Sequence, residues 1–75
     1  MIVTVVAEEK EWDIQADENS SIQNTLKILI ERGMLAVSDQ NIPQTIYSTR
    51  KRRSISTERS YRESGIYQGD ILKIR

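Results

Sequence analysis

The sequence predicts a single α+β domain in which one amphipathic helix covers one face of a mixed β-sheet. The chain has 75 residues, which is enough for one small hydrophobic core. One segment, residues 22–32, has apolar residues at helical spacing. The segments before and after it have the alternation or the β-branched composition that is typical of strands. We therefore expect residues 1–75 to form one domain.

The composition narrows the classes of function. The chain has no Cys and no His, which excludes thiol chemistry, Cys-ligated zinc and the commonest general base. It has 11 basic and 11 acidic residues, so no global field attracts nucleic acid or a membrane surface. No apolar run reaches the ~20 residues that a membrane helix needs. No basic segment and no cleavage site follow Met1, so we expect no secretory signal. We expect a cytoplasmic protein that acts by contact, without a catalytic site, cofactor or metal.

The zero net charge hides an asymmetry along the chain. Residues 1–45 hold eight acidic and three basic side chains, a net charge of −5, whereas residues 46–75 hold eight basic and three acidic ones, a net charge of +5. Two interpretations remain open. The folded chain has opposed charged faces that favour head-to-tail association, or its two halves interleave and the charges partly cancel.

The N-terminal segments predict a hairpin. Residues 2–7 are β-branched and apolar on both sides, which is typical of a central strand. Residues 8–10 form a polar turn, and residues 11–17 alternate, with Trp12 and Ile14 on the apolar side. The short link favours antiparallel pairing of the two strands.

The helix has a start signal, an apolar stripe and a stop signal. Residues 19–21 supply an N-cap, and Arg32 followed by Gly33 favours a C-terminal end. Ile28 lies off the stripe and should be partly exposed. The stripe consists of Ile22, Leu26, Leu29 and Ile30.

A second hairpin is predicted after the helix. Residues 38–45 form a loop, residues 46–50 a strand and residues 53–57 a short strand around Ile55. The turn between them carries the adjacent cations Arg50, Lys51, Arg52 and Arg53.

The last third predicts a short helix, a turn and a strand. Ser60 and Glu63 have the spacing of a capping box, which favours one helical turn. Residues 68–70 form a turn, and residues 71–75 alternate as a strand. The element order is then β-β-α-β-β-(short helix)-β. The compact solution places the last strand beside the first in the middle of the sheet, which is the β-grasp arrangement.

Over nearly its whole length the chain resembles ubiquitin in outline. Ile55, Tyr61 and Ile66 stand where that pattern has core residues, and the run Gly69-Asp70-Ile71-Leu72-Lys73-Ile74 matches its final turn and strand. Among ubiquitin-like proteins the chain is most similar to the YukD/EsaB group of small bacterial proteins associated with type VII secretion. This resemblance implies an accessory or regulatory role, with a larger partner protein in the secretion machinery.

The sequence departs from ubiquitin at its end. Ubiquitin and the sulfur carriers related to it end in a flexible tail with two glycines, which threads the active site of an activating enzyme. Here the last residues are Lys73-Ile74-Arg75. We therefore expect no conjugation through the C-terminus.

The candidate binding surface is the sheet face opposite the helix. Alternation directs Ile2 outward in the first strand, and Ile71 and Lys73 outward in the last. In the third strand either Ile46 or Tyr47 faces outward, and the pattern alone leaves this open. The surface expected from the sequence comprises Ile2, Ile46 or Tyr47, Ile71 and Lys73. The alternative interpretation is that these are scattered surface hydrophobes.

The basic turn, Arg50 to Arg53, is the second candidate. It is either an anionic docking point or a solvated turn that blocks edge pairing. With Arg59 and Arg62 it supports an alternative function, a small nucleic-acid-associated regulator. Only Tyr47 and Tyr61 are near enough in sequence to stack on bases, so this alternative is the weaker one.

Overall fold

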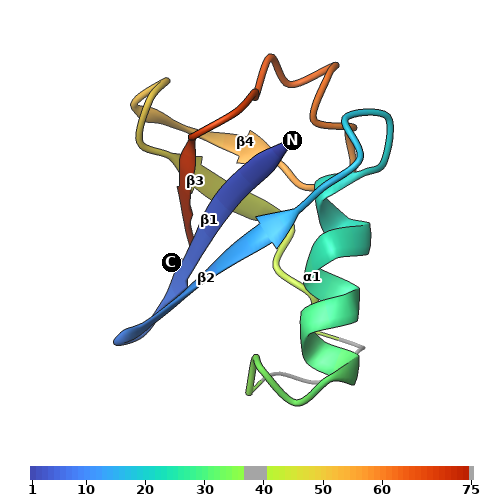
Figure 1. Cartoon of the computed structure of the whole chain (residues 1–75), viewed down its shortest axis with the longest axis vertical. Coiled ribbons are helices and arrows are strands. Elements are labelled where there is room, and N and C mark those ends of the chain that lie inside the picture. Colours follow the sequence, from blue (N-terminus) through green and yellow to red (C-terminus); the bar gives the residue numbers. More distant parts are fainter. Residues whose placement is uncertain (37–40, 75) are drawn as a thin grey trace.

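A computed structural model describes residues 1–36 and 41–74. Its elements are β1 (Ile2–Ala7), β2 (Lys10–Gln15), α1 (Ile22–Glu31), β3 (Thr45–Ser48), β4 (Arg53–Ser56) and β5 (Ile71–Lys73). The strands form one five-stranded mixed sheet, and α1 lies across one side of it (Figure 1). This confirms the predicted α+β, β-grasp fold. Residues 38–40 of the expected loop and Arg75 of the expected last strand lie outside the described residues.

The strand order in the sheet is β2-β1-β5-β3-β4. β1 pairs antiparallel with β2 and parallel with β5, and β3 pairs antiparallel with both β5 and β4. The C-terminal strand therefore lies in the middle of the sheet beside the first, as the sequence predicts. Parallel neighbours need a long crossover, and here α1 and the β3–β4 hairpin lie within it.

The second hairpin is shorter than the sequence predicts. β3 ends at Ser48, two residues before the end of the expected strand, because the chain turns there. The Arg52 amide donates to the Ser48 carbonyl oxygen over 2.8 Å, which closes the turn. Arg52 takes a left-handed φ of 57° at this point, a conformation that non-glycine residues adopt mainly in turns.

The core lies between the sheet and α1. Val3, Val5 and Leu72 point from the two central strands toward the helix and are fully buried. From α1, Ile22, Leu26 and Leu29 meet them, which confirms most of the predicted stripe. Further core residues come from the end of β1, from β3 and from the loops: Ala7, Ile46, Ala16, Leu35, Tyr61 and Ile66.

The predicted helix ends are confirmed. Ser21 is the N-cap, and its Oγ accepts a hydrogen bond of 3.0 Å from the Asn24 amide. After Arg32, the C-cap, Gly33 has a φ of 71°, which a residue without Cβ adopts at little cost. Ile28 lies off the stripe with 42% of its surface exposed.

The expected short helix is replaced by turns. The capping box itself forms: the Glu63 amide donates to Ser60 Oγ over 3.0 Å, and the Ser60 amide donates to Glu63 Oε1 over 3.1 Å. Residues 61–65 are turns, however, so the prediction of a helix was wrong. The Ile66 amide bonds to the Tyr61 carbonyl over 2.9 Å, which reverses the chain and brings Ile66 into the core.

Candidate functional site

The face of the sheet opposite α1 carries exposed apolar side chains. Ile2 of β1 and Ile71 of β5 are 43% and 41% exposed, although their sequence neighbours Val3 and Leu72 are fully buried. Lys73 is exposed on the same face. The outward direction that alternation predicts for these three residues is therefore what the structure shows.

The register places these side chains next to one another. Thr4 lies opposite Ile71, and Val6 lies opposite Lys73. Ile2 is two positions before Thr4 on the same face of β1, so it is a diagonal neighbour of Ile71. We define the open-face patch as Ile2, Val6, Tyr47, Ile71 and Lys73.

In the third strand it is Tyr47, and not Ile46, that lies on the open face. Ile46 is 1% exposed and stands opposite Ile55 on the helix side of the sheet. Including Ile46 in the binding surface is therefore corrected: its side chain belongs to the core. Tyr47 is half-buried and lies opposite Lys73 of β5. Lys73 thus has Val6 on one side and Tyr47 on the other.

Polar contacts frame the patch. Thr4 Oγ1 donates a hydrogen bond of 2.7 Å to Asp13 Oδ1 on the neighbouring strand. The Ile2 amide donates to Gln68 Oε1 over 2.8 Å, and the Gly69 amide donates to the Ile2 carbonyl over 2.9 Å. These bonds hold the turn before β5 against the start of β1, so the backbone under the patch is fixed from both sides.

Asp70 fixes the start of β5. Its carboxylate is buried and accepts a hydrogen bond of 2.7 Å from Ser48 Oγ and one of 3.3 Å from the Arg50 amide. A buried carboxylate needs such donors, because its charge is otherwise costly to remove from water. Asp70 thereby ties the start of β5 to the β3–β4 turn and sets the position of Ile71.

The basic run is divided between different surroundings. Arg50 folds back: its Nη1 donates to the Gln68 carbonyl over 3.0 Å, and its Cζ lies 5.1 Å from the centre of the Tyr67 ring. The Tyr67 ring is 60% exposed and lies beside this guanidinium. The contact crosses 17 positions of sequence, so no local pattern signals it.

The other three basic side chains of the run also have different surroundings. The Lys51 side chain lies over Gly65, where an added Cβ would come within 2.7 Å of Nζ. Arg52 and Arg53 are exposed. The four residues therefore do not form one continuous cationic surface, and only Arg52 and Arg53 point freely to solvent.

Two side chains in the polar network beside the helix, Tyr61 and Glu63, have shifted pKa values. Tyr61 donates from its hydroxyl to Thr25 Oγ1 over 2.7 Å, and burial raises the pKa of the phenol while this bond partly offsets the rise. Hydrogen bonds from the Ser60 amide and hydroxyl lower the pKa of the exposed Glu63 carboxyl. Nearby, Arg62 forms an exposed ion pair with Glu18. These groups act within the fold, and they lie away from the patch.

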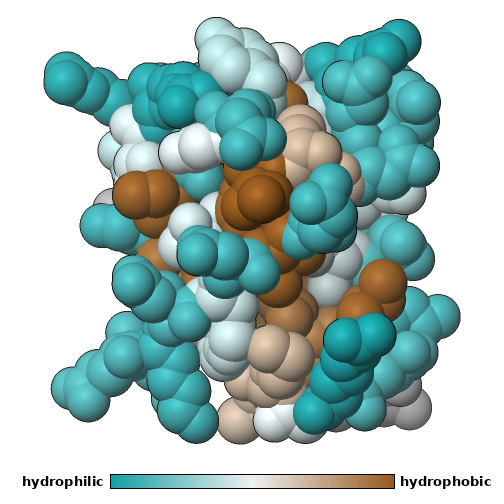
Figure 2. All heavy atoms as spheres, in the orientation of Figure 1, coloured by the Kyte–Doolittle hydropathy of each residue, from teal (hydrophilic) through white to brown (hydrophobic). Residues whose placement is uncertain are grey.

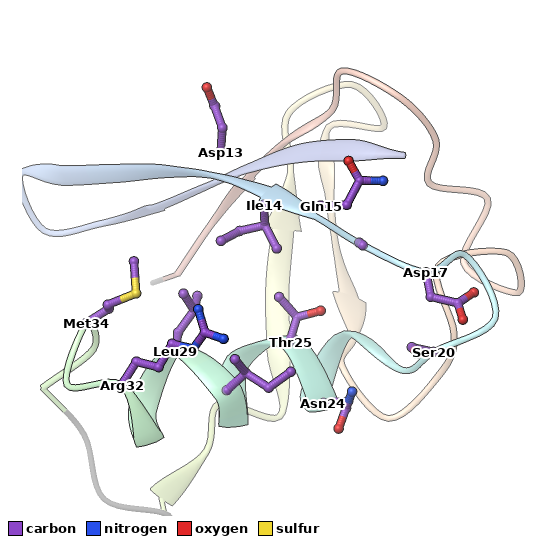
Figure 3. A pocket seen from close by; sticks show the side chains of 12 residues that line it. Asp13, Ile14, Gln15, Asp17, Ser20, Asn24, Thr25, Leu29, Arg32 and Met34 are labelled. Carbon is purple, nitrogen blue, oxygen red and sulfur yellow. The ribbon is translucent and has the colours of Figure 1, made fainter.

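A groove runs between the edge strand β2 and α1. Its volume is about 430 Å³, and apolar side chains including Ile14, Ile28 and Leu29 contribute to its lining. Figure 3 shows Ile14 pointing toward the helix, with Arg32 at one end of the groove and Asp17 at the other. In Figure 2 a band of apolar surface runs down the middle of the view, with hydrophilic side chains on both sides.

Metal-binding groups and membrane-spanning helices are absent from the part of the chain that the structure describes. Residues 1–36 and 41–74 contain no group of acidic side chains placed to hold a metal ion. Within these ranges no helix has the length and apolar character of a membrane span. The hydroxyls of Ser21 and Ser60 are occupied as caps, as the sequence predicts.

Comparison with known proteins supports the fold. No family model and no curated protein matches the sequence. Among solved structures, a ubiquitin-like protein from the hyperthermophilic archaea Caldiarchaeum subterraneum is similar, with a TM-score of 0.51 and 16% sequence identity. The match covers 97% of this chain and 91% of that chain. With the strand order and the position of α1 on one side of the sheet, this shows that the chain has the ubiquitin-like β-grasp fold.

Proposed function

We propose that this protein is a non-catalytic ubiquitin-like interaction module that docks its open-face patch on a larger protein. The observation that carries the proposal is the diagonal proximity of Ile2 and Ile71, two isoleucines about two-fifths exposed on adjacent strands of the sheet. Apolar side chains gathered on a surface are typical of interaction sites, whereas single exposed ones are common on any protein.

The positive charges on and near the open face also favour it as the docking surface. Lys73 sits between Val6 and Tyr47, so a partner that covers the patch must present an acceptor or an acidic group at this point. Arg52 and Arg53, at the end of the same sheet, are exposed and add long-range attraction to an acidic partner. Docking of this kind is non-covalent and uses no chemistry of the C-terminal residues.

The partner class follows from the sequence resemblance alone. The ending Gly69-Asp70-Ile71-Leu72-Lys73-Ile74 and the element order are similar to those of the YukD/EsaB group. On this basis we propose an accessory or regulatory role in a bacterial type VII secretion system, in the cytoplasm. The fold is compatible with many other partners, so the proposal requires a test with the protein's own host.

The test compares matched variants as bait in lysate of the source organism. Ile71→Glu places a charge in the patch, and Ile28→Glu places the same charge on an isoleucine of nearly equal exposure, 42% against 41%, on α1. Proteins captured by the wild type and by Ile28→Glu but lost with Ile71→Glu are partners of the patch. We expect components of the secretion machinery among them.

The same experiment separates the nucleic-acid alternative. The double variant Arg52→Glu with Arg53→Glu removes the exposed cations of the turn. If this variant loses its partners while Ile71→Glu keeps them, the basic turn is the site and the patch is not. Capture of nucleic acid that disappears between low and moderate salt would point to the same conclusion.

A further inference from the structure

The two edges of the sheet carry opposite charge. β2 and its flanking residues, 8–18, hold six acidic side chains and one basic one, a net charge of −5. β4 and its flanking residues, 50–59, hold five basic side chains and one acidic one, a net charge of +4. Because β2 and β4 are the first and last strands of the sheet, like edges of two copies repel and unlike edges attract.

The outer edge of β2 has backbone groups free for pairing. On β1, the Thr4 amide bonds to Asp70 and the Val6 carbonyl accepts from Ile74, so these two residues direct their backbone toward β5. Their partners across the β1–β2 pair, Asp13 and Glu11, must then direct their backbone away from β1. At this edge the N–H and C=O groups of Glu11, Asp13 and Gln15 face outward.

The outer edge of β4 has the same property. The Thr57 amide bonds to the Gln44 carbonyl over 3.0 Å, so Thr57 directs its backbone toward β3. Directions alternate along a strand, and Ser56 and Ser54 therefore direct their backbone to the free edge. Ser54 lies opposite Tyr47, which places its side chain on the open face.

The directions of the two edge strands also fit. β4 runs parallel to β1 and antiparallel to β2, so a second copy in the same orientation presents an antiparallel partner. In both edge strands, the residues whose backbone N–H and C=O groups face the free edge have their side chains on the open face. A ladder between Ser54 of one copy and Asp13 or Gln15 of the next would therefore continue the sheet without turning it over.

We propose that copies of this chain associate head to tail, with β4 of one copy adding to β2 of the next. In either register of the ladder, Ile55, a half-buried apolar residue of β4, lies opposite Trp12 or Ile14 of the next copy, beside the groove between β2 and α1 (Figure 3). The basic start of β4 then approaches the end of β2, where Asp17 lies. This contact is heterologous and open-ended. It places the open-face patches of successive copies side by side, which raises their combined affinity for a repetitive partner.

The test uses two proline variants of the full chain, Asp13→Pro and Ser54→Pro. At both positions the N–H faces the free edge, so proline removes no backbone hydrogen bond of the sheet and blocks the added strand. Asp13→Pro also removes the side-chain hydrogen bond that Asp13 Oδ1 accepts from Thr4 Oγ1. Analytical ultracentrifugation at low salt, at chain concentrations up to about 1 mM, suits a weak contact. We expect the wild type to form oligomers whose average mass increases with protein concentration and decreases with salt. Each variant alone should be monomeric, and an equal mixture should form a one-to-one dimer, because each supplies the edge that the other lacks.

Three results would overturn the proposal: a monomeric wild type at the highest concentration, single variants that assemble like the wild type, and a mixture that stays monomeric. Association that Ile71→Glu abolishes and the edge variants leave unchanged would assign it to the open face instead. Circular dichroism verifies the fold of each variant. If a proline variant does not fold, Asp13→Arg and Arg53→Glu replace the pair. Each alone should associate less than the wild type, and an equal mixture should associate more than either alone, because both contacts between unlike copies again join opposite charges.

Discussion

The two faces of the sheet come from the same strands but have different surroundings. On the helix side, Val3 and Leu72 are fully buried beneath α1. On the other side, Ile2 and Ile71, the residues next to them in sequence, are 43% and 41% exposed. These four side chains are all aliphatic and similar in size, so their own chemistry does not decide which face is buried. One helix covers only one face, and the apolar residues on the other face serve the interaction that we propose.

The difference between the two faces predicts that substitutions at adjacent residues of β5 have very different effects on the free energy of unfolding. Leu72→Ala leaves a cavity in the core and should lower the free energy of unfolding by about 2–5 kcal/mol. Ile71→Ala removes atoms that are already partly in water and should cost about 0.5 kcal/mol. Urea denaturation of the two variants measures both values. Equal losses would show that the open face is packed as tightly as the core.

The fixed position of the patch gives a second, smaller prediction. Asp70→Ala leaves the buried Ser48 hydroxyl and the Arg50 amide without their acceptor, so it should lower the free energy of unfolding by about 1–3 kcal/mol. Asp70→Asn keeps an acceptor and should cost less. Hydrogen exchange of the Arg50 amide should accelerate in the alanine variant. An unchanged stability would mean that Asp70 does not anchor β5.

The smallest prediction concerns the turn at residues 60–63, away from both faces. The fold lowers the pKa of Glu63, because Ser60 donates to its carboxylate. The ionised form therefore stabilises the folded state above the ordinary pKa of glutamate, and this contribution is lost as the pH falls through the lowered pKa. The Tm difference between wild type and Glu63→Gln should be larger at neutral pH than at about pH 3. A difference that stays constant with pH would contradict this role.

The alternation of apolar and polar residues, together with the capping and turn residues, was sufficient to predict much of the fold. The order of the strands along the chain, the N-cap at Ser21, the exposure of Ile28 and the capping box of Ser60 and Glu63 are all local patterns, and the structure confirms them. The outward direction of Ile2 and Ile71 was predictable for the same reason, since a strand has a period of two.

The features that the sequence did not reveal depend on long-range contacts. Alternation makes Ile46 and Tyr47 point to opposite faces, but only the pairing of β3 with β5 decides which one is buried. Arg50 belongs to a run of cations, and its stacking on Tyr67 requires the last turn to lie beside the hairpin. The charge of the two edges becomes meaningful only once the strand order is known.

The proposed function requires that a partner contacts the open face. The most direct measurement is isothermal titration of a partner captured by the wild type against wild type, Ile71→Glu and Ile28→Glu. We expect Ile71→Glu to weaken the affinity by about 30-fold or more, the loss of about 2 kcal/mol that is typical of a hot spot. Ile28→Glu, a matched change on α1, should leave the affinity within about twofold of wild type. Unchanged binding by Ile71→Glu, or an equal loss with Ile28→Glu, would contradict the claim.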